Sequence, residues 1–221
     1  MALTKEWTVA AITVADLAGV VYSSGKVFNG LATGRLDTEN FLRSGSLDGI
    51  TSRSDLALLE DLRDCAQLII DHGGQRIDAD FVRAVNATIS RSGALHPGQF
   101  RTTDQRIGVA TRYGLHTPDG ITEDVLQQFL DAALQGNDPC EVALELFVVL
   151  AKAQPFEDGN KRTALFVANA ALIGSGTGKL LTIPVDEQDT FNDLLARAYI
   201  FGEHDALKSL LRDQGLTDLG H

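Results

Sequence analysis

A short polar segment, residues 154–162, holds the side chains best suited to chemistry in this chain. It reads Gln-Pro-Phe-Glu-Asp-Gly-Asn-Lys-Arg and lies between two apolar stretches. Gly159 allows a tight turn in which several backbone N–H groups point at one anion, as they also do at the start of a helix. Lys161 and Arg162 add two positive charges, and an arginine can hold two phosphate oxygens at once. The segment therefore predicts a phosphate-binding turn.

A metal ligand stands beside these cations. The carboxylate of Asp158 suits Mg²⁺, which commonly bridges a protein to the phosphates of a substrate. We expect Phe156 to anchor the turn in the core, and Asn160 to cap the next helix or to contact the anion. The ordinary alternative is a helix–turn–helix link with a polar tip. Charges between buried helices must be paired or used, which favours a site.

The first residue of the segment weakens the case for an active enzyme. The amide of Gln154 does not titrate near pH 7, so it cannot act as a general base. Losing a positioned base typically costs on the order of 10²–10⁴ in rate. Phosphate and metal binding depend on the other residues. We therefore expect bound nucleotide with little group transfer.

Apolar residues at helical spacing surround the turn. One helical face spans residues 56–70, with Ser54 or Asp55 as its cap, and a shorter helix begins near Asp78. A further helix opens at residues 122–124, and two stripes follow near the C-terminus. The sequence predicts an all-α helical bundle.

Two of the expected helices are apolar nearly all round, which indicates burial. The first should be capped by Asp138, with Pro139 at its first position and Glu141 completing a capping box. The second covers residues 163–173. The polar turn is therefore the junction of two core helices.

Two segments depart from the helical pattern. Residues 98–118, rich in Thr, Gly and Arg, predict a short β-hairpin or extended flap. Residues 22–34 contain glycines and adjacent serines, and predict a loop after an N-terminal core helix within residues 9–21. We accordingly expect an N-terminal helical extension and loop over residues 1–35, and the main domain over residues 36–221.

Composition limits the possible partners. The chain has 221 residues, 44% of them hydrophobic, and a net charge of −11, which disfavours nucleic acid and anionic membranes. No apolar run approaches the length of about 18 residues that a membrane span needs. Cys65 and Cys140 fall in helix-like segments and predict reduced packing residues, consistent with a cytoplasmic protein.

The polar segment resembles the signature of the Fic family (Fic/Doc, or Fido, domains), which is His-Pro-Phe-x-x-Gly-Asn-x-Arg. Every fixed position matches except the first, where Gln154 stands in place of histidine. Residues 97–102 and 106–108 resemble the segment leading into the family's flap, and the stretch from Ile183 to Tyr199 is also similar. The resemblance covers roughly residues 81–211 and implies a Fic-type helical bundle with a short β-hairpin flap.

The resemblance also implies an activity. Fic proteins bind ATP with Mg²⁺ and transfer part of it, most often AMP, to a hydroxyl of a target protein (AMPylation). The motif histidine, here Gln154, would deprotonate that hydroxyl, and Asp158 would hold the Mg²⁺. The nucleotide would be held by Gly159, Asn160, Lys161 and Arg162.

The flap of such proteins aligns the target protein as an added strand, a known recognition mode. By the resemblance this role falls to Thr103, Arg106, Ile107 and Val109. Lys161 is similar to the Doc branch of the family, which has Asp-Ala-Asn-Lys-Arg and transfers a phosphate, whereas the preceding residues resemble the AMP-transferring branch. The sequence leaves AMP and phosphate transfer both open.

Some Fic proteins carry an inhibitory helix with the pattern Ser/Thr-x-x-x-Glu-Gly/Asn. Residues 44–49 resemble it through Ser44, Asp48 and Gly49, with aspartate in place of glutamate. The family's glutamate pairs with an arginine three residues after the motif arginine, and this position is Leu165 here. We therefore do not expect the inhibitory ion pair to form.

Gln154 leaves three interpretations open. The protein is a non-catalytic or altered Fic module, or it is an inactivated toxic enzyme. In the third, another group supplies the base, and His96 and His116 at the two ends of the flap are the candidates. A second class of function also stays open, namely a binding or regulatory module that works with an antitoxin or an inhibitory partner.

Overall fold

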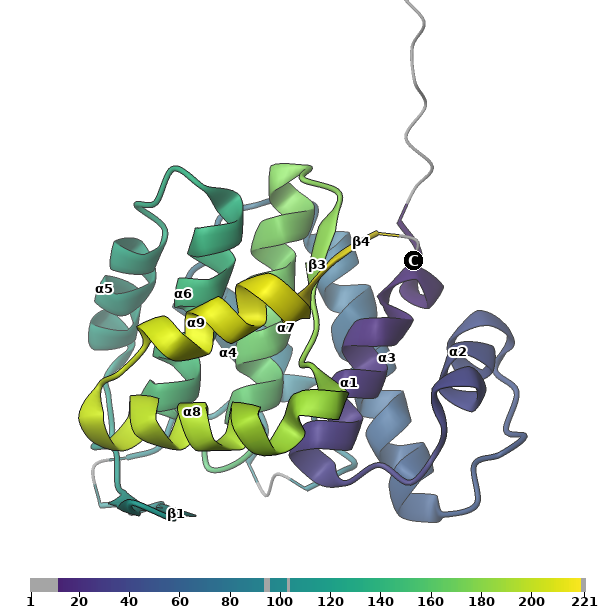
Figure 1. The fold of residues 1–221 in the computed structure, drawn as a ribbon, viewed down its shortest axis with the longest axis horizontal. Coiled ribbons are helices and arrows are strands. Elements are labelled where there is room, and N and C mark those ends of the chain that lie inside the picture. The colour runs from purple at the N-terminus through teal and green to yellow at the C-terminus, as the bar shows by residue number, and fades with distance from the viewer. Residues whose placement is uncertain (1–11, 94–95, 103, 220–221) are drawn as a thin grey trace, which may run out of the picture.

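The computed structural model describes residues 12–93, 96–102 and 104–219. Their fold is mainly helical (Figure 1), which confirms the all-α prediction. The N-terminal half contains η1 (Val14–Leu17), α1 (Ala18–Asn29), α2 (Arg35–Ser44), α3 (Arg53–His72) and α4 (Ala79–Ala87). The later helices are α5 (Glu123–Ala133), α6 (Pro139–Ala153), α7 (Asn160–Ser175), η2 (Val185–Glu187), α8 (Gln188–Phe201), α9 (Asp205–Leu210) and η3 (Leu211–Gly215). No helix among the described residues is both long and apolar enough to cross a membrane.

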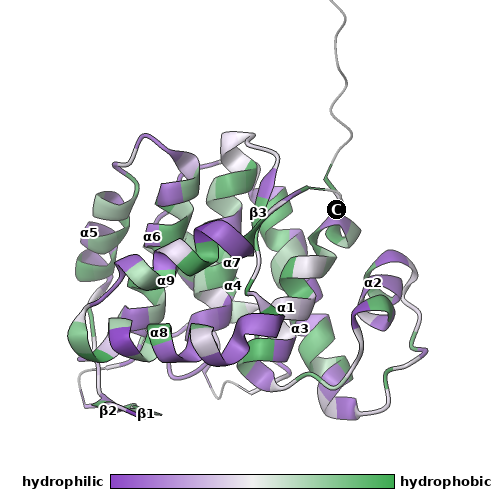
Figure 2. Cartoon of the chain, in the orientation of Figure 1, coloured by the Kyte–Doolittle hydropathy of each residue, from purple (hydrophilic) through white to green (hydrophobic). Residues whose placement is uncertain are grey.

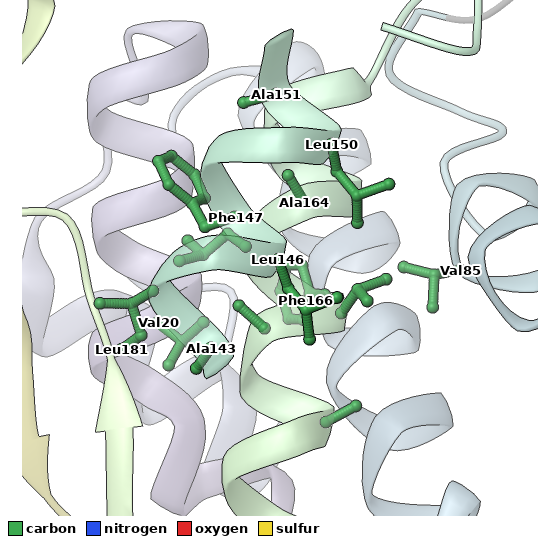
Figure 3. Packing of buried hydrophobic residues seen from close by; sticks show 14 of the residues in the cluster. Val20, Val85, Ala143, Leu146, Phe147, Leu150, Ala151, Ala164, Phe166 and Leu181 are labelled. Atoms are coloured by element: carbon green, nitrogen blue, oxygen red, sulfur yellow. The ribbon is translucent and has the colours of Figure 1, made fainter. Parts of the chain in front are cut away.

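Helix α7 lies at the centre of the bundle. It packs against α1, α3, α4 and α6, and most of its residues are buried. Figure 3 shows Phe166 of α7 among the apolar side chains of α6. The predicted burial of these two helices is confirmed. Their sequences are apolar nearly all round because each helix has neighbours on most sides.

Two pairs of short strands complete the described fold. The hairpin of β1 (Val109–Thr111) and β2 (Gly114–His116) is antiparallel, with Val109 opposite His116. It confirms the predicted flap and lies at one end of the molecule, beyond α8 (Figure 2). The second pair, β3 (Lys179–Leu181) and β4 (Leu216–Asp218), was not predicted.

Helix capping was partly predictable. Asp138 accepts a hydrogen bond from the first turn of α6, as expected, and Asp78 and Thr122 do the same at the predicted starts of α4 and α5. The cap predicted for α3, Ser54 or Asp55, was wrong. Ser52 is the cap, and its side chain accepts a hydrogen bond from the Asp55 N–H. The Asp55 carboxylate instead accepts hydrogen bonds from the distant loop at Ala32 and Thr33.

The capping box expected for α6 does not form. The Glu141 carboxylate accepts two hydrogen bonds from Arg212, at 2.6 and 2.9 Å, and is held toward the C-terminal segment instead. The arginine also keeps the pKa of Glu141 below its usual range through these hydrogen bonds. A long-range ion pair therefore replaces the local box.

The loop predicted over residues 22–34 is also wrong, because α1 continues to Asn29 and only residues 30–34 connect it to α2. Gly25 lies in the middle of this helix against Leu31, where a Cβ would come within 2.9 Å of Cδ2. Ser23 and Ser24 are buried, and Ser23 Oγ accepts a hydrogen bond from the Ile183 N–H. The small residues permit close packing of a helix. The predicted helix residues 9–11 lie outside the described part of the chain.

We expect Asn169→Ala to lower the free energy of unfolding by about 2–3 kcal/mol, because a buried N–H and two carbonyls lose their partner. The Asn169 amide joins α7 to β3: it donates to the carbonyls of Leu165 and Leu181 and accepts from the Leu181 N–H. Chemical denaturation measures the change. Asn192→Ala, at an exposed position of α8, is the matched control and should stay within about 0.5 kcal/mol. Equal losses in the two variants would contradict the role given to this amide.

Candidate functional site

The polar turn joins the end of α6 to the start of α7. Gln154 ends α6 with φ 45° and ψ 63°, and is the one described residue other than glycine with a positive φ. Such a conformation costs a non-glycine residue about 1–3 kcal/mol and persists only where the surroundings enforce it. Here the Gln154 N–H donates to the Leu150 carbonyl at 3.2 Å, and the Gln154 carbonyl accepts from Arg101 Nε at 2.9 Å.

Two side chains close the turn from inside. Phe156 is 1% exposed and stacks on Phe100 with ring centroids 5.3 Å apart, so it anchors the turn as expected. The Asn160 side chain accepts from the Phe156 N–H at 2.9 Å and donates to the Phe156 carbonyl at 2.8 Å. Asn160 thus holds the turn in shape, and its side chain does not cap α7.

Asn86 of α4 is a structural residue of the site that sequence reasoning missed. It is fully buried, donates to the Asp158 carbonyl and to Thr163 Oγ1, and accepts from the Gly98 N–H. Gly159, with φ 76°, lies directly against it. Asn86 therefore fixes the turn and the segment before the flap with one amide. Only its position on the apolar face of α4 could have pointed to it.

Asp158 and Arg162 form an ion pair at the N-terminus of α7. Arg162 Nη2 lies 3.2 Å from Asp158 Oδ2, and Nη1 donates to Ser92 Oγ at 2.7 Å. The arginine side chain is 2% exposed, whereas the aspartate is 49% exposed. The carboxylate can therefore reach a ligand from solvent while the arginine supplies a fixed charge beneath it.

Lys161 is the second cation of the turn. Its Nζ lies 5.3 Å from the ring centroid of Phe28, at the end of α1. Burial, followed by the charge of Arg162, lowers the pKa of this lysine below its ordinary value, and Asp158 opposes the shift. The lysine therefore lies in a partly desolvated, positively charged environment, where an added anion gains the most.

A pocket of about 170 Å³ opens at this turn. Its lining combines the predicted motif with the flap and the tip of α1: Phe28, Asn29, residues 107–109, Gln154 and residues 157–162. A second pocket of about 550 Å³ lies between β1 and α8 and shares Val109 and Lys161 with the first. Phe28 and Asn29 were missed because residues 22–34 were assigned to a loop.

The flap reaches the turn through Arg101. Its guanidinium is 3% exposed and donates to the carbonyls of Gln154, Gln105, Pro118 and Asp119. Ile107 and Val109 are half-buried toward the pocket, whereas Arg106 is exposed. Thr103, the remaining predicted flap residue, lies outside the described residues.

The two candidate histidines have other contacts. His96 Nδ1 lies 2.9 Å from Glu157 Oε2, and His116 Nε2 lies 2.9 Å from the Lys152 carbonyl. The His116 ring also stacks on Tyr199. Neither histidine lines the pocket at the turn.

The residues of the inhibitory pattern lie elsewhere. Ser44 is the last residue of α2, and Asp48 and Gly49 follow in a turn. None of the three lines the pocket. Leu165, at the position of the family's partner arginine, is fully buried in the core.

The described residues contain no cluster of three or more His, Cys, Asp or Glu that could hold a metal by themselves. A single exposed carboxylate fits Mg²⁺, which keeps several waters and takes its remaining ligands from substrate phosphates. The residues present thus suit a metal that arrives with a phosphate, and Asp158 is the one that would hold it.

Comparison with known proteins identifies the fold. A Fic-domain signaling protein of Bacteroides thetaiotaomicron superposes with a TM-score of 0.71 at 18% identity, covering 89% of this chain and 81% of that one. Fic-1 of C. elegans superposes with a TM-score of 0.68 at 19% identity, over 88% of this chain and 58% of that structure. The chain thus spans less than two-thirds of the nematode structure.

The N-terminal Fic domain of a Bep effector protein of Bartonella quintana, crystallised with ADP, superposes with a TM-score of 0.50 at 20% identity. The match covers 75% of this chain and 85% of that one. No curated protein sequence matches the chain. Residues 76–172, which include the turn, the flap and α4 to α6, match the model of the Fic/DOC family. The chain has the fold of Fic domain proteins, and residues 76–172 are the part that matches the model of their family.

Proposed function

We propose that the protein binds ATP with Mg²⁺ at the turn between α6 and α7, and that Gln154 holds its transfer activity at a low level. The observation that carries the proposal is the pair of adjoining pockets that share Lys161. One is lined by cations and a helix N-terminus, and the other has room for a nucleoside.

Phosphate binding is supported by the electrostatics of the smaller pocket. Arg162 and Lys161 flank the first turn of α7, where free N–H groups carry a partial positive charge. Both side chains are shielded from water, which strengthens their attraction for an anion. The partly exposed Asp158 would hold Mg²⁺ against the same phosphates. The Fic domain of Bartonella quintana that was crystallised with ADP supports a nucleotide as the ligand.

Nucleoside binding is supported by the larger pocket. It extends from Lys161 between β1 and α8, and Tyr199, Leu195 and Ala196 supply an apolar wall. A phosphate chain at the turn would therefore continue into a half-apolar hollow, the usual surroundings of a base and ribose.

A protein hydroxyl is the acceptor we propose, docked along the flap as an added strand through Arg106, Ile107 and Val109; Thr103, the fourth residue predicted for this role, lies outside the described residues. In AMP transfer the hydroxyl oxygen would bond to the α-phosphorus while the bond to pyrophosphate breaks, and the hydroxyl proton would need an acceptor. In phosphate transfer the hydroxyl oxygen would instead bond to the γ-phosphorus while the bond to ADP breaks. An amide at residue 154 is no such acceptor, so binding without efficient transfer is expected.

The alternative is a non-catalytic regulatory module, for example in a toxin–antitoxin pair in the cytoplasm. The observation in its favour is the burial of Gln154, which is 4% exposed. In such a module the flap and the pockets would serve recognition alone.

We expect Gln154→His to raise transfer by roughly 10²–10⁴, the usual contribution of a positioned base. Histidine tolerates the left-handed backbone of residue 154 better than most residues, so the turn should keep its shape. The measurement incubates the protein and the variant with a cell lysate and either α- or γ-labelled ATP. Label on protein in the variant alone would indicate a lost base, and the label that moves separates AMP from phosphate.

A matched control keeps the new histidine and adds Asp158→Ala, which should abolish the gained transfer by removing the metal ligand. If neither label moves in the histidine variant while ATP still binds, the regulatory module is the correct function.

We also expect ATP affinity to fall as the pH rises from neutral into the alkaline range. The protonated form of Lys161 attracts phosphate, and its lowered pKa means that the charge is lost at a lower pH than for an ordinary lysine. The dissociation constant, measured by calorimetry, should rise by about tenfold. Lys161→Arg should remove this rise, because arginine keeps its charge. Parallel profiles for the two proteins would exclude Lys161 as the titrating group.

A further inference from the structure

The guanidinium of Arg162 is held by a loop that lies outside the turn of residues 154–162. Its Nη1 donates to Ser92 Oγ at 2.7 Å, and its Nη2 reaches Asp158 Oδ2 at 3.2 Å. Ser92 follows α4 and lies seventy residues before Arg162 in the chain. The serine is thus a partner of this buried cation that the sequence motif does not contain.

The loop around Ser92 is itself fixed by α3. Asp61 is fully buried, and its carboxylate accepts from the Ser92 N–H at 2.8 Å and from the Arg91 N–H at 3.0 Å. Arg91 Nη1 also donates to Asp61 at 3.0 Å and to Asp64 at 2.9 Å. The backbone at Gly93 then passes close to Asp158, since a Cβ there would lie 2.6 Å from Oδ2. A carboxylate of α3 therefore sets where Ser92 meets Arg162.

The two partners of Arg162 differ in what a ligand would do to them. Asp158 is half exposed, and a bound cation would compete with Arg162 for its carboxylate. Ser92 Oγ is neutral and attached to a fixed backbone, so it would keep its hydrogen bond. An unpartnered guanidinium at 2% exposure is costly, and the retained bond limits its movement.

We infer that Ser92, held in place by Asp61, is a positioning residue of the phosphate site. It keeps the Arg162 guanidinium oriented toward the ligand when the Asp158 carboxylate binds a metal cation instead of Arg162. This inference rests on the proposed function, because it assigns a further residue to the same site.

The test measures ATP binding in the presence of Mg²⁺ by calorimetry, using the full chain. Ser92→Ala should weaken ATP binding by about tenfold, the effect of losing a hydrogen bond to a charged group. Ser92→Thr keeps the hydroxyl and should bind ATP within about twofold of the original protein. Ser90→Ala, at an exposed serine of the same loop, is the matched control and should not change binding.

A double-mutant cycle separates positioning from a general effect on the fold. Arg162→Lys keeps the charge but loses the fork that reaches Ser92, so adding Ser92→Ala to it should cost less than about twofold. A tenfold loss that persists in the lysine background would overturn the positioning role. So would a Ser92→Ala protein that binds ATP as well as the original. If the original protein binds no ATP at all, the proposed function fails, and this inference fails with it.

Discussion

Arg162 is a cation buried at the start of α7, and its guanidinium needs partners that the neighbouring elements must supply. Taking an ion out of water costs several kcal/mol unless its hydrogen-bonding groups are satisfied. One partner comes from the turn itself and the other from the loop after α4, which α3 holds through Asp61. Asn86 of α4 ties the backbone of the same turn. Helices α3 and α4 thus help to hold the positive charge of Arg162 at the start of α7, beside a small pocket.

The shape of the turn depends little on the side chain of residue 154. Its left-handed conformation is enforced through main-chain groups, since Leu150 and Arg101 bind the N–H and the carbonyl of Gln154. Asn160 and Phe156 close the remainder of the loop without it. These contacts do not depend on whether the side chain of residue 154 is a base or an amide, so we expect the turn to keep its shape in either case.

Local signals predicted more of this fold than of its site. A cap such as Asp138 depends on residues a few positions apart, and both this cap and the helix start predicted near Asp78 are confirmed. The capping roles predicted for Asp55 and Glu141 were wrong, because their carboxylates accept hydrogen bonds from residues far away in the sequence. Gln154 and residues 157–162 line one pocket. The residues that support them, Asn86, Ser92 and Arg101, come from other elements and carry no local pattern that identifies them.

Helix α1 shows how a misassigned segment hides part of a site. Its glycine and serines suggested a loop, yet small residues are what allow this helix to lie close to its neighbours. The packing brings Phe28 over Lys161 and between the turn and α8, where its ring also lies 6.2 Å from that of Phe191. The aromatic face attracts the ammonium group while shielding it from water, and the shielding lowers the lysine pKa. A boundary between α1 and the remaining helices would separate these two side chains. The N-terminal segment therefore works as one wall of the site, even though its sequence lies outside the matched family region.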